Sequence, residues 1–365
     1  MKKKIYFVLG STDGQRCFKR IGEYKRAGYE VKVFGFERGL NVPIAGKEDC
    51  EIIASFSNDL PYIKRIRIIY SSLKRLYDSY KSEKEVVWYY FGELIALFSY
   101  KLNSNRRFIY EESDLSTMKY AFLTKIKRKL QNHIIKRSLL TVYTSEGFLS
   151  YHFGLKSPYP ENTLIKPNKV NPLITSLPPV SKTKEIGGIR FGFVGCIRFH
   201  SVYQLASYIA HKHPEHECHF FGVYDNVYQQ EKYATLSKYS NIHFHGAFKN
   251  PYELPTIYAQ IDVLIATYDT NRIGIRYAEP NKLYEAIYFR KPIIVSPGTF
   301  LCEKVEKLGI GYVIDASDVD DMAKKLAYIK ETYKEKTATI CQIPKETAVD
   351  DASELIKRTD ILFVK

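Results

Sequence analysis

Two glutamates, an asparagine and a lysine lie within the seven-residue run Glu279–Glu285 (EPNKLYE). A short apolar helix pattern, a Lys-Pro break and the buried-strand run Pro292–Val295 follow it. Polar groups concentrated where a helix begins are a common way to build an anion or nucleotide site. An ordinary connection between a helix and a strand, with solvated charges, would show the same pattern.

The segment 191–201 (FGFVGCIRFHS) is a second candidate, because it has the pattern of a strand, a turn and a helix. Gly195 at the turn lets a ligand approach the backbone closely. Arg198 is expected at the end of the strand, beside a helix N-terminus, and both features suit a diphosphate. The segment lacks the full glycine fingerprint of dinucleotide sites, so a tight turn with a solvated arginine explains it equally well.

An acidic cluster that contains Glu112 and Asp114 follows the predicted strand Phe108–Tyr110. Carboxylates at the carboxyl end of a strand are well placed to act as a general base or to hold sugar hydroxyls. The same residues could instead cap a helix and occupy its first turn. The loop Gly10–Arg16 could hold an acceptor or a sugar, or could be a plain connection, and it lacks the Lys-Ser/Thr ending of a phosphate-binding loop.

Histidines gather in the second half of the chain, at positions 211, 213, 216, 219, 243 and 245. Their spacing does not place them on one helix face, and no pair of cysteines completes a zinc site. We therefore interpret them as polar residues around a helix–strand loop and expect no metal site.

Two successive βαβ patterns must position these residues. In the first, strands or helices are predicted at 4–9, 18–27, 30–35, 62–80, 86–90, 108–110, 120–137 and 140–143. A proline-rich break follows, and the pattern restarts with elements at 189–194, 202–211, 218–222, 243–246, 252–259, 263–266, 282–288, 292–295, 301–308 and 320–332. The sequence thus predicts an α/β fold of two Rossmann-like domains that face each other across a cleft.

The domain boundaries follow from the position of the break. We expect an N-terminal domain at residues 1–170, a linker at 171–188 and a C-terminal domain at 189–345. The remaining segment, 346–365, mixes helical spacing with charge, and we expect it to pack back on the N-terminal domain.

The composition excludes several protein classes. The chain is 45% hydrophobic, which excludes global disorder. It has no apolar run of about 18 residues that would predict a transmembrane helix and no convincing signal peptide. Its six cysteines show no paired spacing and indicate reduced thiols in the cytoplasm. None of the RNA-binding aromatic signatures occurs, so we expect no nucleic-acid partner.

The positive charge is concentrated in the first half of the chain. Residues 1–180 carry 31 Lys and Arg against 17 Asp and Glu, whereas residues 181–365 carry 24 against 23. The predicted helices 62–80 and 120–137 hold much of this charge and could lie on anionic lipid. For each helix singly we expect the apolar residues, such as Phe122, Ile126 and Leu130, to face the core and the basic residues to face solvent.

The chain resembles bacterial glycosyltransferases of the two-Rossmann-domain (GT-B) type, most closely the retaining, group 1 enzymes of family 4. The resemblance is strongest at residues 140–315. It rests on FVGCIR at 193–198, on GAF at 246–248 with the helix and strand that follow, on PNKLYEA at 280–286 with KPIIVS at 291–296, and on TSEG at 144–147 with IKPN at 165–168.

The resemblance implies roles for particular residues. Glu285 matches the glutamate that binds the donor's ribose hydroxyls. Arg198 matches the basic residue that neutralises the negative charge of the diphosphate. Gly195, Asn281 and Lys282 would line the diphosphate and sugar, and Phe248 would lie in the loop at the nucleotide base. No metal and no cofactor besides the nucleotide-sugar substrate are expected.

The sequence also departs from the family pattern. The glutamate usual eight residues before the ribose glutamate is Tyr277, and Glu279 is close by but out of register. The first-domain histidine near the donor sugar is missing. We expect Asp114 or Glu112 to be the acceptor-side carboxylate. Glu279 is the third candidate for catalysis.

The expected function is transfer of a sugar from a nucleotide-sugar to a glycan or lipid-linked acceptor. It would serve capsule or lipopolysaccharide synthesis, with retention, at the cytoplasmic face of the plasma membrane. Two alternatives remain: a non-catalytic partner that binds nucleotide-sugar, and a sugar-nucleotide epimerase of the same fold.

Overall fold

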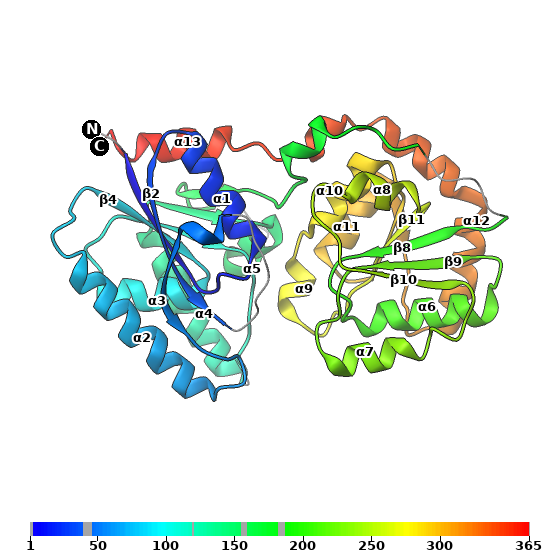
Figure 1. Cartoon of the computed structure of the whole chain (residues 1–365), viewed down its shortest axis with the longest axis horizontal. Coiled ribbons are helices and arrows are strands. Elements are labelled where there is room, and N and C mark those ends of the chain that lie inside the picture. The colour runs from blue at the N-terminus through cyan, green and yellow to red at the C-terminus, as the bar shows by residue number, and fades with distance from the viewer. Residues whose placement is uncertain (1–2, 39–45, 119, 155–158, 182–186, 365) are drawn as a thin grey trace. The chain divides into compact units, whose positions relative to one another are not determined.

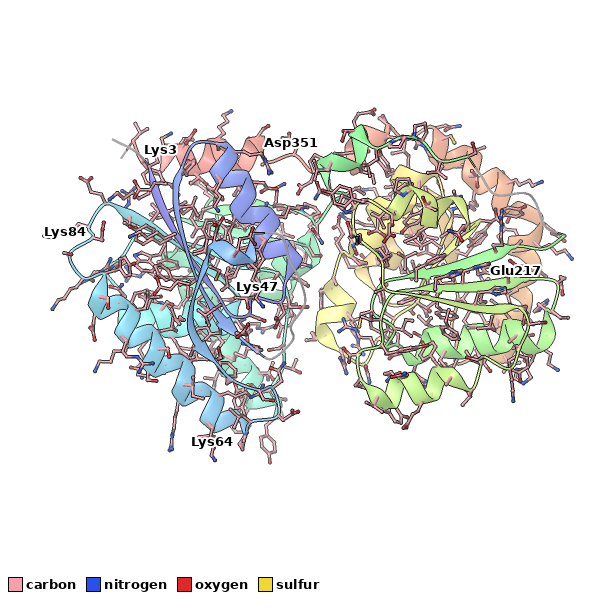
Figure 2. The ribbon with its side chains drawn as sticks, viewed as in Figure 1. Lys3, Lys47, Lys64, Lys84, Glu217 and Asp351 are labelled. Carbon is pink, nitrogen blue, oxygen red and sulfur yellow. The ribbon has the colours of Figure 1, made fainter. Side chains whose placement is uncertain are left out.

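The computed structural model describes residues 3–38, 46–118, 120–154, 159–181 and 187–364. The chain divides into two compact units, each with its own parallel sheet and helices on both faces of it (Figures 1 and 2). Unit 1 comprises Met1–Pro167 and Ala352–Lys365, and unit 2 comprises Asn168–Asp351. This is the α/β fold of two Rossmann-like domains that the sequence predicts. No described helix has both the length and the apolar character needed to span a membrane.

Unit 1 is built on a seven-stranded sheet with the order β3-β2-β1-β4-β5-β6-β7. The strands are β1 (Lys4–Leu9), β2 (Glu30–Glu37), β3 (Cys50–Ser55), β4 (Val86–Phe91), β5 (Phe108–Glu112), β6 (Leu140–Tyr143) and β7 (Thr163–Ile165). The helices are α1 (Gln15–Arg26), α2 (Tyr62–Ser79), α3 (Glu93–Leu102), α4 (Ala121–Arg137), α5 (Glu146–Phe153) and α13 (Ser353–Ile361).

Unit 2 is built on a six-stranded sheet with the order β10-β9-β8-β11-β12-β13. The strands are β8 (Arg190–Val194), β9 (Glu217–Phe221), β10 (Ile242–Gly246), β11 (Val263–Ala266), β12 (Ile293–Val295) and β13 (Gly311–Val313). The helices are α6 (His200–Lys212), α7 (Val227–Ala234), α8 (Leu254–Ala259), α9 (Ile273–Tyr277), α10 (Asn281–Phe289), α11 (Phe300–Leu308) and α12 (Val319–Cys341).

The central strands of each sheet are buried on both faces, which explains their continuous apolar runs. In unit 2 the core on one face of the sheet includes residues of α6 and α12, and the core on the other includes residues of α8, α10 and α11. The strand order reverses between β8 and β11 in unit 2 and between β1 and β4 in unit 1. Ligands of open α/β sheets bind at such a switch point, beyond the carboxyl ends of the strands.

The predicted elements agree closely with the structure where a strand is almost completely buried. β1, β6 and β11 have the predicted bounds. The elements that the sequence did not reveal are short or partly exposed, such as β7, β13 and α9. β3 and α3 were also missed, and α12 continues well beyond the predicted end at Thr332.

The segment expected to be a linker, 171–188, differs from the expectation in its first part. Pro172–Ser176 form a 3-10 helix whose Ile174 is buried in the core of unit 2. Asn171 caps this helix, because its side chain accepts a hydrogen bond from the amide of Leu173. Residues 182–186 of the segment lie outside the described residues.

The segment 346–365 is shared between the units. Val170 and Val349 form a parallel bridge within unit 2, and the amide of Asp350 donates to the carbonyl of Val170 at 2.9 Å. From residue 352 the chain belongs to unit 1, where Leu355 of α13 is buried in the core. The hydroxyls of Thr359 and Tyr24 are 2.8 Å apart, which joins α13 to α1.

Helix α4 corrects one sequence expectation. Its apolar residues were expected to face the core, but Phe122, Ile126 and Leu130 are 61%, 51% and 52% exposed. Lys127 and Gln131 are buried instead. Both donate to the half-buried carboxylate of Glu93 of α3 at 2.6 Å. Lys127 also donates to Ser116 and Gln131 also donates to Glu112, so polar partners on other elements hold this face of α4 inward.

Candidate functional site

The carboxyl ends of β8 and β9 approach each other so closely that glycine is required there. Gly195 and Gly222 follow the two strands and have positive φ angles of 141° and 142°. A Cβ on Gly222 would lie 1.8 Å from the carbonyl oxygen of Gly195. At Gly195 itself a Cβ would meet the Cε of Lys282 at 3.8 Å, so the end of β8 lies against the start of α10.

Glu285 is the centre of a buried polar cluster at the start of α10. Its Oε1 accepts from Asn281 Nδ2 at 2.8 Å, and its Oε2 accepts from Lys282 Nζ at 2.7 Å and from the hydroxyl of Tyr258. The residue is only 2% exposed. A carboxylate can accept about four hydrogen bonds, roughly two at each oxygen. The three donors hold the carboxylate in place, and Oε1, which accepts from Asn281, keeps the capacity to accept a further hydrogen bond.

Asn281, Lys282 and Glu285 could be grouped from the sequence, because residues three and four apart share one helix face. Tyr258 could not, because it comes from α8. Burial, followed by the charge of Glu285, raises the pKa of the Tyr258 phenol well above its ordinary value. The phenol therefore stays protonated and donates to the carboxylate.

Arg198 and Glu285 lie within electrostatic range of one side chain, Tyr268, which follows β11. Burial and the charge of Glu285 raise the pKa of the Tyr268 phenol, and the charge of Arg198 lowers it. The ring of Phe199 contacts both Arg198 and Tyr268. The guanidinium carbon of Arg198 lies 5.0 Å from the centre of this ring, and the ring of Tyr268 packs edge-on against it with the ring centres 4.7 Å apart. Arg198 is exposed, so its guanidinium is accessible to an anion.

The N-terminus of α6 differs from the expectation that it would be open to a diphosphate. The amides of His200 and Ser201 donate to the carboxylate of Asp269 at 3.0 and 2.9 Å. The carboxylate of Asp269 therefore balances the partial positive charge of this helix N-terminus and occupies its first free amides. The sequence placed Asp269 just after a predicted strand, but nothing in it indicated that α6 would be its partner.

Glu279 is buried and turned toward α11. Its carboxylate pairs with Lys304 Nζ at 2.6 Å and accepts from the hydroxyl of Tyr284. Phe248, the candidate residue of the nucleotide-base loop, is half-buried and packs against the core beneath α8 and α10. The structure thus places Gly195, Asn281, Lys282 and Glu285 in contact, and directs Glu279 to a separate ion pair.

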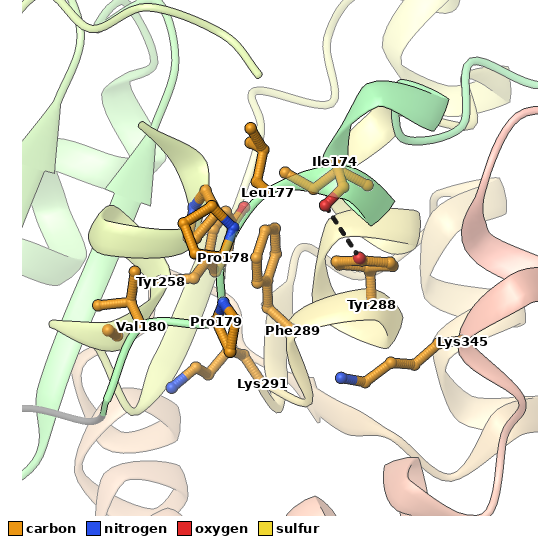
Figure 3. A pocket seen from close by; sticks show the side chains of 12 residues that line it. Ile174, Leu177, Pro178, Pro179, Val180, Tyr258, Tyr288, Phe289, Lys291 and Lys345 are labelled. Carbon is orange, nitrogen blue, oxygen red and sulfur yellow. Dashed lines mark hydrogen bonds between the residues drawn. The ribbon is translucent and has the colours of Figure 1, made fainter. Parts of the chain in front are cut away.

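A cavity of about 260 Å³ lies beside this cluster, between the segment that follows Ile174, α8 and the end of α10 (Figure 3). Tyr258 belongs to both features: its hydroxyl meets Glu285, and its ring lines the cavity and stacks on Phe289 with ring centres 4.2 Å apart. The cavity wall is mostly apolar, with Lys291 and Lys345 as its charged members. Lys291 Nζ donates to the carbonyl of Ile261 at 2.6 Å.

The two acceptor-side candidates of unit 1 have different surroundings. Glu112 is fully buried, and its carboxylate is 2.8 Å from His152 Nε2 and 3.2 Å from Gln131 Nε2. Asp114 is exposed. Arg16, in the first turn of α1, donates to the carbonyl of Ser113 at 3.2 Å and brings the start of that helix next to Asp114. Of the pair, only Asp114 can meet a substrate at the surface.

The region around unit 2's cluster matches a known family. Residues 196–345 match the family model described as glycosyl transferases group 1. No curated protein matches the chain in sequence at the required significance.

Solved structures of low sequence identity share the fold over nearly the whole chain. Sucrose-phosphate synthase from Thermosynechococcus elongatus is 14% identical with a TM-score of 0.70, and the alignment covers 99% of both chains. HepE from Anabaena, in complex with UDP-glucose, is 13% identical with a TM-score of 0.67 and covers 99% of this chain and 100% of its own. The lipopolysaccharide outer core galactosyltransferase WaaB is 16% identical with a TM-score of 0.59 and covers 92% and 94%.

Proposed function

We propose, from the premise that residues 196–345 form a group 1 glycosyltransferase domain in a chain with the GT-B fold, that the chain transfers a sugar from a nucleotide-sugar to a glycan or lipid-linked acceptor. The transfer would retain the configuration at the anomeric carbon. Its product would become part of a cell-surface polysaccharide, such as capsule or lipopolysaccharide. The observation that carries this proposal is the buried Glu285 cluster at the carboxyl ends of the strands, inside the family match.

The donor roles follow from the chemistry of the site. Glu285 would accept from the ribose hydroxyls, and Arg198 would stabilise the negative charge of the departing diphosphate. Asn281 and Lys282 would lie near the diphosphate and sugar, beside Gly195, where a backbone without a side chain leaves room. In the reaction the bond between the anomeric carbon and the diphosphate breaks, and a bond to the acceptor oxygen forms.

The acceptor role falls to the exposed carboxylate of unit 1. Asp114 would accept hydrogen bonds from the acceptor or take the proton that its hydroxyl loses. Glu112, the last residue of β5, would hold the start of the loop that contains Asp114 in place through its contacts with His152 and Gln131. Glu279, paired with Lys304, would act on the donor side only if that ion pair opened.

The same proposal includes contact with an anionic membrane, and α4 supplies the surface. Phe122, Ile126 and Leu130 recur every fourth residue and are more than half exposed. Lys125 and Lys129 are exposed beside them. An exposed apolar stripe bordered by basic residues suits the interface of a bilayer that contains anionic lipid. Each basic residue near such a surface contributes about 1 kcal/mol.

The donor proposal predicts that one nucleotide of the kind released from sugar donors stabilises the protein and that the others do not. Thermal unfolding should be followed with UDP, GDP, dTDP and CMP, because ligand bound to the folded state raises its midpoint. The sugar form of the stabilising nucleotide should then be turned over with a lipid-extract acceptor. No shift with any nucleotide would contradict the proposal. Binding without turnover would favour the non-catalytic partner, and a product from donor alone would favour the epimerase.

The membrane proposal predicts that the full chain sediments with vesicles of phosphatidylcholine and 30 mol% phosphatidylglycerol and not with phosphatidylcholine alone. Ile126→Glu with Leu130→Glu should lower the bound fraction at least about tenfold. Val227→Glu, which changes an apolar residue of α7 that is more exposed than either, is the control. If the α4 variants bind vesicles as the unaltered chain does, or change its oligomeric state instead, the stripe serves another purpose.

A further inference from the structure

Four polar side chains gather on one face of the two outermost strands of unit 2. β10 is the edge strand and pairs with β9 in parallel, with His243 opposite His219. Because side chains two residues apart share a face of a strand, Glu217 and His219 of β9 lie on the same face as His243 of β10. The register of β10 shifts after Phe244, and the 3.0 Å contact of His245 with His219 places His245 beside them. Glu217, labelled in Figure 2, begins β9.

The opposite face of these strands is the apolar one. Cys218 and Phe220 of β9 and Ile242 of β10 belong to the core that includes α6. The four polar side chains therefore lie on the other face, where Glu217, His219 and His243 are half-buried and His245 is exposed. The structure thus offers a set of nitrogen and oxygen donors that water and ions can reach.

The donor atoms of this set converge. One ligand atom each from Glu217, His219 and His243 can be chosen so that all lie within 4.8 Å of one another. His219 Nε2 is 2.9 Å from a carboxylate oxygen of Glu217. The rings of His219 and His243 are stacked with their centres 4.7 Å apart. Two imidazoles and one carboxylate are a donor set that zinc accepts, with a fourth position left for water.

His245 has a different position in the set. Its Nε2 is 3.0 Å from Nδ1 of His219, the ring nitrogen that does not face Glu217. A histidine that binds a metal nearly always makes a hydrogen bond with its other nitrogen, and this bond fixes the ring and its tautomer. His245 supplies that bond here.

A second group, His213, Glu215 and His216, is less suited to an ion. It comes from the single loop between α6 and β9. Nδ1 of the buried His216 already accepts from the amide of Ile189 at 3.2 Å, so that ring serves the fold. The strand cluster, in contrast, is held by two paired strands in register.

We propose that Glu217, His219 and His243 bind a divalent transition-metal ion of the zinc class, with His245 orienting His219. The ion would join the edge strand β10 to β9 through side chains as well as through the backbone. Gly246, the last residue of β10, leads directly to the loop that contains Phe248, so the ion would also hold the base of that loop.

The test uses untagged full-length protein stripped of metal with a chelator. Added Co²⁺ should produce the visible d–d absorption of a site with nitrogen ligands, saturating at one ion per chain, and Zn²⁺ should displace it. Zn²⁺ should also raise the midpoint of thermal unfolding, because it binds the folded chain. The chelator should reverse this shift.

Variants locate the ion. His219→Ala and His243→Ala should each abolish the absorption, and His245→Ala should weaken Co²⁺ affinity about 10- to 100-fold. Glu217→Gln keeps the shape of the side chain. It replaces an alanine variant in the test if circular dichroism shows that the alanine variant does not fold. His213→Ala, from the neighbouring loop group, should bind Co²⁺ normally. The proposal is overturned if the unaltered chain shows no saturable absorption, if His219→Ala and Glu217→Gln retain it, or if His213→Ala loses it.

Discussion

Replacing Glu285 with glutamine should lower the affinity for the nucleotide-sugar about 10- to 100-fold, which corresponds to roughly 1.5–3 kcal/mol. Glutamine keeps the size of the side chain but removes the negative charge to which ribose hydroxyls would donate. It also leaves the ammonium group of Lys282 without its charged partner at 2.7 Å. Isothermal titration with the nucleotide that stabilises the unaltered chain measures the effect.

The matched control is Asp262→Asn, another buried carboxylate of unit 2. Asp262 pairs with Arg190 at 3.0 Å, and both lie at the starts of β11 and β8, at the opposite end of the sheet from Glu285. Both variants should lose stability, because each leaves a buried cation without its partner. Only Glu285→Gln should lose affinity. Equal affinity losses would assign the effect to folding, and unchanged affinity in Glu285→Gln would remove this residue from the donor site.

Replacing Arg20 with methionine should lower the free energy of unfolding of unit 1 by about 3–5 kcal/mol. Arg20 is 3% exposed, and its Nε is 3.0 Å from Glu111, which is completely buried. It also pairs with Glu23 at 2.5 Å. Burial lowers the pKa of this guanidinium, but Glu111, Tyr89 and Glu23 outweigh burial and raise it well above its ordinary value. Its loss leaves the buried Glu111 of β5 without the cation that pairs with it, and leaves Glu23 with the more distant Lys166, whose Nζ is 3.8 Å away.

The measurement can be confined to unit 1, because the single tryptophan of the chain, Trp88, is buried in β4. Its fluorescence in urea should shift to a lower midpoint in Arg20→Met. Lys25→Met, on the same helix, removes an exposed ion pair: the side chains of Lys25 and Asp49 are 40% and 57% exposed. This variant should lower the free energy of unfolding by less than about 1 kcal/mol. Adding Glu111→Gln to Arg20→Met should recover part of the loss. Equal shifts in the two single variants would contradict this account.

The fold was largely predictable because buried parallel strands leave a direct trace in sequence. β1, β6 and β11 are short apolar runs between turn residues, and the restart of the pattern after the prolines indicated a second sheet. The orientation of α4 was not predictable, because Lys127 turns inward to meet Glu93 of another helix and Ser116 of the preceding loop. Local spacing carries no information about such a partner.

The candidate site was predictable only where its residues are neighbours on one element. Asn281, Lys282 and Glu285 share one helix turn, so their contact follows from spacing. Tyr258 and Asp269 reach the site from α8 and from the end of β11, and only the order of the strands brings them there. The histidines show the limit most clearly, because His219 and His243 become neighbours through strand pairing and not through their distance in sequence.

The crossing of the chain between its units has a consequence for biosynthesis. Unit 1 contains the first strands to be made, yet its core includes Leu355 and its first helix bonds to Thr359, both of which are translated after all of unit 2. As the polypeptide leaves the ribosome, the sheet of unit 1 must wait with an uncovered surface while unit 2, an uninterrupted stretch of sequence, is completed. The unit that is begun first is therefore finished last.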